Sequence, residues 1–128
     1  QAIVLNEKLK NIQKKLEKRV KNADRYKKNL KDSDNVRTHA QEKQPMNIFP
    51  ITFENKEIKE ATIKVLSSKN IPFGEYYPIG LNNLPMVKEK KRVLKNVDWA
   101  TKNILCLPCH PNLQYQEIDR ISELILKA

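Results

Sequence analysis

The chain has 128 residues, of which 39% are hydrophobic and 31% charged, a balance typical of one polar globular domain. No apolar run approaches the roughly 18 residues that a membrane-spanning helix needs, and two cysteines do not make the disulfide framework of a small secreted protein. The first residues place a short apolar run before their charges, the reverse of a signal peptide, so we expect a cytoplasmic location.

The formal net charge of +10 allows a polyanionic partner such as nucleic acid, or an anionic small ligand. A lysine- and asparagine-rich, glycine-poor composition produces the same charge without any dedicated surface. Aromatic residues make up only 6% of the chain, and no platform for stacking bases is evident. We therefore keep a non-catalytic basic binding or oligomerisation module as the alternative function and do not expect nucleic acid as a partner.

The start of the chain is predicted to form one long helix over residues 2–32. Its apolar residues alternate three- and four-residue steps, as one face of a helix does; they are Leu5, Leu9, Ile12, Leu16, Val20, Ala23, Tyr26 and Leu30. Ile3 and Val4 add apolar surface beside this stripe, and lysines occupy the opposite face. Because large apolar patches rarely stay uncovered on monomers, we expect this helix to dock on a partner or on a second copy.

A polar connection over residues 32–44 follows, and its His39 is expected to be exposed. Residues 46–53 alternate in the way a strand does. Pro50 cannot donate a backbone hydrogen bond, which predicts that this strand lies at a sheet edge or is bulged there.

The next helix is predicted to start after Asn55, a suitable N-cap, and to end near Ser68. Asn70 can supply the left-handed residue that follows a helix end. The residues predicted to face inward are Ile58, Ala61, Thr62, Val65 and Leu66.

Residues 71–77 are predicted to form a second strand, followed by a loop over residues 78–85. This loop contains two prolines, a glycine and two asparagines, and a binding site is expected on such a loop when a rigid scaffold holds it. Residues 86–94 are predicted to be weakly helical.

A short helix over residues 97–103, with Trp99 and Ala100 facing inward, leads to a third strand over residues 104–107. The last helix is predicted over residues 115–127. Its inward face consists of Ile118, Ile121 and Ile125.

Three strands are too few for a doubly wound sheet. We therefore predict an α+β fold, in which a long helix precedes a small, mainly antiparallel three-stranded sheet with helices packed on one side. The whole chain, residues 1–128, is one domain; the helix occupies residues 1–32 and the sheet subdomain residues 45–128.

Cys106, Cys109 and His110 have the C-x-x-C-H spacing that in other settings attaches haem. No secretory signal is evident, however, and Pro108 and Pro111 bracket a stiff turn. A redox pair places its first cysteine at a helix N-terminus, whereas Cys106 lies inside a predicted strand. Zinc needs four ligands, and this cluster offers three. We interpret Cys106 as a small buried strand residue and assign no metal site.

Four segments match one family pattern in order and spacing. The first lies in the long helix and consists of Gln1, Ala2, Lys18, Arg19, Ala23, Tyr26 and Leu30. The second is the strand NIFPITF. The third consists of Ile71, Tyr77, Pro78, Leu81 and Pro85. The fourth consists of Leu105, Leu107, Pro108, His110, Pro111, Leu113, Glu117, Ile118 and Ile121. Together they resemble the C-terminal small domain of the DegT/DnrJ/StrS sugar aminotransferases, fold-type-I enzymes that depend on pyridoxal phosphate (PLP).

The resemblance implies substrate-binding roles for Tyr77, Pro78 and Asn82. Two positions of this loop depart from the family pattern. Gly80 stands where the family usually has proline, and Asn82 stands where it usually has the histidine of a Pro-Leu-His loop near the substrate.

The resemblance also implies that the PLP-binding large domain, which carries the Schiff-base lysine, is absent from this chain. No lysine here matches that motif, so we assign no catalytic residue and expect no PLP bound to this chain alone. The expected function is that of a C-terminal domain or truncated form of a nucleotide-sugar aminotransferase, inactive alone. The complete enzyme would move an amino group from glutamate to a keto-sugar nucleotide in cell-surface polysaccharide biosynthesis. The expected partner is the missing large domain, or a second copy bound through the first helix.

Overall fold

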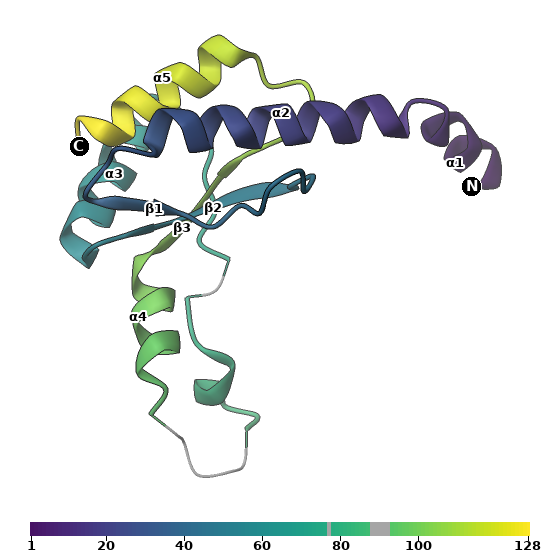
Figure 1. Cartoon of the computed structure of the whole chain (residues 1–128). Helices are drawn as coiled ribbons and strands as arrows, with labels where there is room; N and C mark the ends of the chain where they lie inside the picture. The colour runs from purple at the N-terminus through teal and green to yellow at the C-terminus, as the bar shows by residue number, and fades with distance from the viewer. Residues whose placement is uncertain (77, 88–92) are drawn as a thin grey trace.

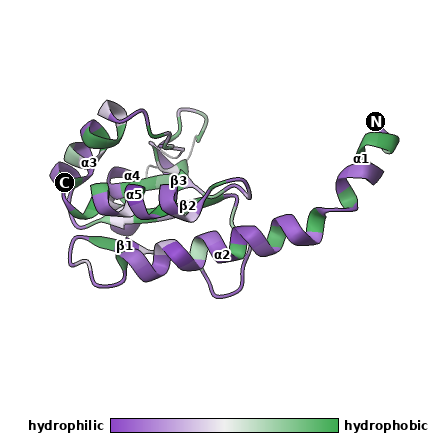
Figure 2. Cartoon of the chain, turned by 90° about the horizontal axis from the view of Figure 1, so that it is seen from above, coloured by the Kyte–Doolittle hydropathy of each residue, from purple (hydrophilic) through white to green (hydrophobic). Residues whose placement is uncertain are grey.

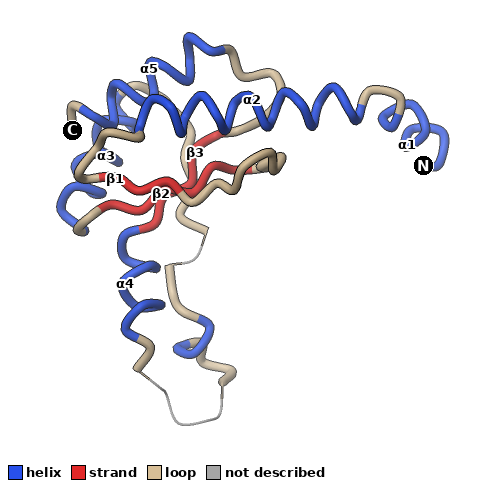
Figure 3. The backbone as a smooth tube through the Cα atoms, in the orientation of Figure 1, coloured by secondary structure: helices blue, strands red, loops and turns tan. Residues whose placement is uncertain are grey.

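The computed structural model describes residues 1–76, 78–87 and 93–128. Within them the elements are, in chain order, α1 (Ala2–Leu9), α2 (Ile12–Leu30), β1 (Val36–Thr38), β2 (Ile48–Phe53), α3 (Lys56–Ser68), the 3-10 helix η1 (Leu81–Asn83), α4 (Lys95–Asn103), β3 (Ile104–Pro108) and α5 (Tyr115–Leu126). Helices α2 and α5 lie side by side over one face of the sheet, and α4 points away on the opposite side (Figure 1). Figure 3 distinguishes the helices, strands and loops of this α+β fold, which confirms the predicted class.

The sheet is antiparallel throughout, with the strand order β1-β2-β3. In the pairing of β2 with β3, Phe49 lies opposite Leu107 and Ile51 lies opposite Leu105. Alternate residues of a strand share a face, so these four side chains lie on the face that the helices cover. All four are buried.

The second strand of the sequence prediction is reduced to a single bridge. Gly74 and Cys106 exchange backbone hydrogen bonds of 2.9 Å, and no strand forms within residues 71–76. The next hydrogen-bonded pair in this antiparallel register would be Pro72 with Pro108, and neither proline has an N–H to donate. The sheet still has three strands, because β1 forms where the sequence predicts only a polar connection.

Pro50 lies in the central strand, so the prediction of an edge or bulged position is wrong. β1 pairs with β2 only as far as Thr38 opposite Ile51. One step further, the His39 N–H donates to the Pro50 carbonyl at 3.4 Å, but Pro50 has no N–H to donate back. The ladder between the two strands therefore ends at the proline. His39 is exposed, as predicted, although its Nε2 lies 2.8 Å from the Thr52 hydroxyl.

The N-terminal region forms two helices rather than the single long helix that its periodicity predicts. Lys10 and Asn11 separate α1 from α2, and Asn11 has φ −113° and ψ 8°, outside helical values. No residue of α1 is buried, whereas the second half of α2 packs on the sheet. Helices in proteins depend on such packing for most of their stability. A weak helix former such as asparagine can therefore interrupt a helix where no packing supports it. Figure 2 shows α1 and its apolar residues lying beyond the rest of the fold.

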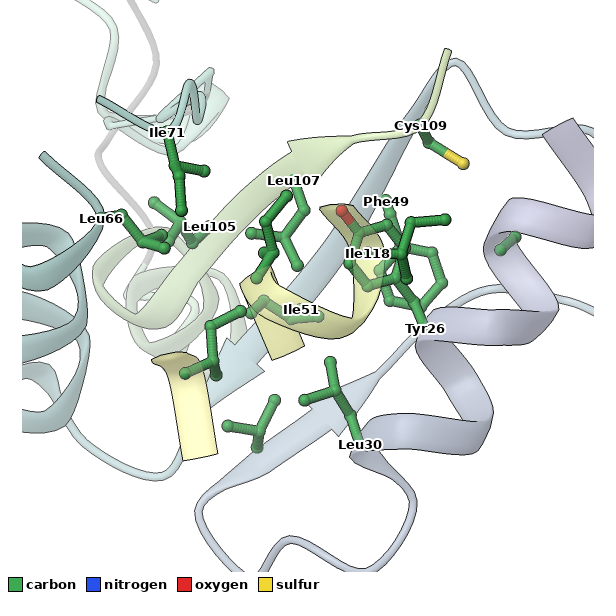
Figure 4. Packing of buried hydrophobic residues seen from close by; sticks show 14 of the residues in the cluster. Tyr26, Leu30, Phe49, Ile51, Leu66, Ile71, Leu105, Leu107, Cys109 and Ile118 are labelled. Atoms are coloured by element: carbon green, nitrogen blue, oxygen red, sulfur yellow. The ribbon is translucent and has the colours of Figure 1, made fainter. Parts of the chain in front are cut away.

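The hydrophobic core fills the space between α2, α5 and the sheet (Figure 4). Tyr26 stacks on Phe49 with ring centroids 4.9 Å apart and 24° between the ring planes. Burial raises the pKa of Tyr26, and its hydroxyl has no hydrogen-bond partner among the described residues. The predicted inward face of α5 is confirmed, because Ile118, Ile121 and Ile125 are all buried.

Both end signals predicted for α3 are confirmed. The Asn55 side-chain oxygen accepts a hydrogen bond of 3.0 Å from the Ile58 N–H, and Asn70 has a φ of 54°. The inward face is only partly as predicted, because Lys59 is buried together with Thr62 and Leu66.

Helix α4 forms at the predicted place, but the prediction that Trp99 faces inward is wrong. Its surface is 42% exposed. Helix α4 points away from the sheet instead of lying on it (Figure 1). No helix in the part of the chain that the structure describes is long and apolar enough to cross a membrane.

A polar contact joins α2 to α5 beside the core. The Arg25 guanidinium donates to both carboxylate oxygens of Asp119, at 2.7 Å each, and Asn29 Nδ2 donates to the same carboxylate at 2.8 Å. The Arg25 guanidinium also lies 5.7 Å from the centre of the Tyr115 ring. The hydrogen bonds from Arg25 and then Asn29 lower the pKa of Asp119 to about 2.

This contact predicts a pH-dependent contribution to stability. A carboxyl whose pKa is lower in the folded chain than the roughly 3.9 of an unfolded aspartate stabilises the fold above that value. The contribution is lost as the pH falls towards 2. Asp119→Asn is therefore expected to lower the urea midpoint at pH 6, and the difference from the wild type is expected to shrink steadily between pH 4 and pH 2. Asp24→Asn, an exposed carboxylate on α2, is the matched control and should change the midpoint little at either pH.

Candidate functional site

Cys106 in β3, and Cys109 and His110 in the turn after it, were considered above as a possible haem, redox or metal site. Both thiols are free and buried, whereas His110 is exposed. Burial raises the pKa of Cys106, and it raises that of Cys109 to about 11 against the opposing charge of Arg19. Both side chains are therefore protonated thiols at neutral pH. The thiolate is the form that acts as a nucleophile or binds a metal, so these cysteines are not activated for either role. Across the described ranges, no group of three His, Cys, Asp or Glu residues could hold a metal ion.

Helix α2 binds this turn through backbone carbonyls. Arg19 Nη1 donates to the carbonyl oxygens of Met46 at 3.0 Å and Cys109 at 3.3 Å. Asn22 Nδ2 donates to the carbonyl oxygen of His110 at 2.9 Å. The turn thereby fixes the end of β3 and the approach to α5 against α2, which is a structural role.

The chain between the Gly74 bridge and β3 projects away from the sheet. After the Gly74 bridge the chain departs from β3, and it returns through α4; we call the described residues of 75–103 the arm (Figure 1). Its two sides are joined where Asn83 Nδ2 donates to Asp98 Oδ1 at 3.2 Å. Of the segment predicted to be weakly helical, residues 88–92 lie outside the described residues, and residues 86–87 and 93–94 are not helical.

The arm holds the substrate-binding residues implied by the sequence. Pro78 is exposed, Asn82 is half-buried in η1, and Tyr77 lies outside the described residues. A cavity of about 370 Å³ lies elsewhere, on the helical side of the sheet, where Lys18 and Lys21 of α2 face the start of α5. The candidate residues therefore lie on a projecting element and not in that cavity.

Gly80 keeps the backbone conformation of the proline that the family usually has there, with φ −63° and ψ 144°. It nevertheless packs closely, because a Cβ atom at this position would lie 2.6 Å from both Val97 Cγ1 and Asn82 Oδ1. The space of the missing side chain is thus taken by α4 and by the candidate residue Asn82. The absence of a side chain at Gly80 thus allows η1 to lie close to α4.

Two apolar surfaces remain uncovered in the described chain. One, the N-terminal stripe, consists of Ile3, Val4, Leu5, Leu9 and Ile12. The other lies on the arm and consists of Ile79, Leu81, Met86, Val87, Val93, Leu94 and Trp99. Exposed apolar side chains in such number are typical of surfaces that contact further protein.

Of the lysines that the structure describes, one is buried in the fold. A Schiff-base lysine needs an amine that is free to face its cofactor. The buried lysine here is Lys59, whose Nζ lies 2.7 Å from Glu75 Oε1 and donates to the Lys102 carbonyl oxygen at 3.2 Å. Its ammonium is therefore engaged within the fold. The periodicity of α3 could have revealed it, since residues 59, 62 and 66 share one helical face.

The solved structures that resemble this fold include sugar aminotransferases. A protein from Brucella abortus, described as a DegT DnrJ EryC1 StrS aminotransferase, superposes with a TM-score of 0.79 at 29% identity, over 98% of this chain and 34% of that one. A GDP-4-keto-6-deoxymannose-3-dehydratase with a trapped PLP-glutamate geminal diamine has a TM-score of 0.80 at 20% identity, over 93% and 33% of the two chains. This second likeness shows the fold alone.

The sequence comparison agrees. The chain is 28% identical over 127 residues to the UDP-2-acetamido-2-deoxy-3-oxo-D-glucuronate aminotransferase of Pseudomonas aeruginosa. This match covers 92% of this chain and 33% of the relative. The fold is therefore that of part of a sugar aminotransferase. Residues 1–126 match the DegT/DnrJ/EryC1/StrS aminotransferase family, and the chain belongs to that family. It spans about a third of the length of the relatives it matches.

Proposed function

We propose that this chain is the C-terminal small domain of a PLP-dependent nucleotide-sugar aminotransferase, and that it is inactive alone. The observation that carries the proposal is the match of nearly the whole chain to about a third of each relative. In the complete enzyme, an amino group would pass from glutamate to a keto-sugar nucleotide, with PLP as the carrier of the amino group. We place this reaction in polysaccharide biosynthesis in the cytoplasm.

We take the substrate class from the Pseudomonas aeruginosa relative. The Pseudomonas aeruginosa protein is an aminotransferase of a UDP-linked 3-oxo sugar. At 28% identity we take from it the class, a keto-sugar nucleotide, and not the individual sugar. A nucleotide sugar is a large polar anion, and the arm offers exposed residues around Pro78 and Asn82 where such a ligand can be approached from outside the core.

In the assembled enzyme we assign Pro78 and Asn82 to the substrate side of the active site, together with Tyr77 on sequence grounds. The N-terminal stripe and the apolar surface of the arm would then contact the large domain that carries PLP.

When mixed with PLP, the chain alone is expected to form no stoichiometric Schiff base. We expect no exposed lysine to take up the aldehyde selectively, and the buried Lys59 is held by Glu75 and Lys102. The measurement is borohydride reduction followed by mass spectrometry of the intact chain and its peptides. We expect scattered, substoichiometric adducts whose distribution is the same in Lys59→Met. One adduct per chain at a single lysine would contradict the proposal that this domain is inactive alone.

A further inference from the structure

One buried ammonium contacts both places where the arm joins the sheet. The Lys59 side chain is only 8% exposed, and its Nζ contacts Glu75 Oε1 and the Lys102 carbonyl oxygen. Glu75 is the first residue after the Gly74 bridge, and Lys102 is the second-last residue of α4, just before β3. The two contacts therefore lie at the two roots of the arm.

Each contact is of a strong kind. The last carbonyl groups of a helix have no partner within it, and a positive charge is favoured at a helix C-terminus. The Lys59 ammonium meets both conditions at the Lys102 carbonyl of α4. Its contact with Glu75 pairs a buried cation with a carboxylate whose side chain is 46% exposed. Without Glu75 the ammonium would remain buried with one known partner, which is costly.

The other contact described within the arm acts differently. The hydrogen bond from Asn83 to Asp98 joins η1 to α4, and so it holds the arm to itself. Lys59 belongs to α3, and α3 packs against α5 and β2 in the body of the domain. A contact of this second type connects the arm to the body of the domain, in addition to the packing of α4 against α3 and β2.

We propose that Lys59 is the positioning residue of the arm: through Glu75 and Lys102 it sets the direction in which Pro78 and Asn82 project from the sheet. Its role in presenting these two residues to a nucleotide sugar rests on the function proposed above. The positioning itself does not, and it can be tested on this chain alone.

The test is hydrogen exchange followed by mass spectrometry on Lys59→Met. Methionine retains an unbranched apolar stem of similar length, so the packing of α3 is kept while both polar contacts are lost. Peptides covering residues 78–87 and 95–103 are expected to exchange about tenfold faster or more, as suits the loss of charged hydrogen bonds. Peptides of β2 and α5 are expected to keep wild-type exchange.

Three further variants sharpen the result. Glu75→Gln removes only the ion pair and is expected to accelerate residues 78–87 more than residues 95–103. Lys59→Arg keeps a cation with several donors and is expected to restore most of the protection. Lys56→Met is the matched control, because it removes a lysine of the same helix that pairs with Glu60 at 2.9 Å and not with the arm; exchange in the arm should not change.

The proposal is overturned if Lys59→Met accelerates arm and core peptides equally, since Lys59 would then only stabilise the domain. It is also overturned if the arm peptides are unchanged. Should Lys59→Met fail to fold, Glu75→Gln decides, and unchanged exchange in residues 78–87 overturns the proposal. The PLP experiment bears on the proposed function and leaves this result unaffected.

Discussion

Phe49→Ala is expected to lower the free energy of unfolding by about 3–5 kcal/mol, the usual cost of removing a buried phenylalanine side chain. Phe49 is fully buried, stacks on Tyr26 and lies opposite Leu107, so it contacts both the helical layer and the neighbouring strand. Small domains are stable by only about 5–15 kcal/mol. The variant should therefore lose a large part of its stability, seen as a lower midpoint in urea denaturation followed by circular dichroism.

Two variants calibrate this result. Phe49→Leu keeps most of the buried volume and is expected to cost less than about 1.5 kcal/mol. Trp99→Ala removes a larger aromatic side chain, but one that is 42% exposed on the arm, and it should cost less than Phe49→Ala. If Trp99→Ala proved the more destabilising change, the core would not lie between the sheet and the helices α2 and α5.

The second large effect concerns self-association. In the absence of a large domain, copies of this chain are expected to associate through the N-terminal stripe, because apolar surfaces of this kind seldom stay exposed. Leu9 and Ile12 are 60% and 43% exposed. Replacing both by aspartate puts two charges into the contact and is expected to weaken association by about 100-fold or more. Thermal unfolding should hardly change, since neither residue belongs to the core.

Sedimentation at increasing protein concentration measures the effect. The matched control is Asn6→Asp with Gln13→Asp, which adds the same charge at exposed positions outside the stripe and should leave association close to that of the wild type. A wild-type chain that remains monomeric at high concentration would refute the prediction.

The elements best predicted from the sequence are those whose local signals agree with their packing. Helix α3 has a capping asparagine at Asn55 and a left-handed residue at Asn70, and α5 has an apolar face that lies on the sheet. In both, the local preference and the tertiary contacts favour the same structure.

The predictions failed where long-range contacts decide. A periodic sequence cannot tell that α1 has nothing to pack against, so the opening of the helix at Asn11 was not foreseen. β1 has three residues, too few to show alternation. The burial of Lys59 depends on Glu75 and Lys102, which the fold brings to α3 from 16 and 43 residues away in the sequence.

The candidate site residues come from the family resemblance and not from local structural signals. Tyr77, Pro78 and Asn82 were selected by their order in a family pattern and not by their own chemistry. The structure places Pro78 and Asn82 on the arm. Their contact with substrate stays a prediction.

The prolines of the sheet also bear on how copies of this chain can aggregate. Exposed strand edges are templates for adding further strands and so for fibre formation. Pro72 faces Pro108 beside the outer edge of β3, and β1, on the other edge, is only three residues long. Neither margin offers a continuous row of free donors and acceptors. Association of this domain should therefore stay between helices and remain reversible, without growth of the sheet from one molecule to the next.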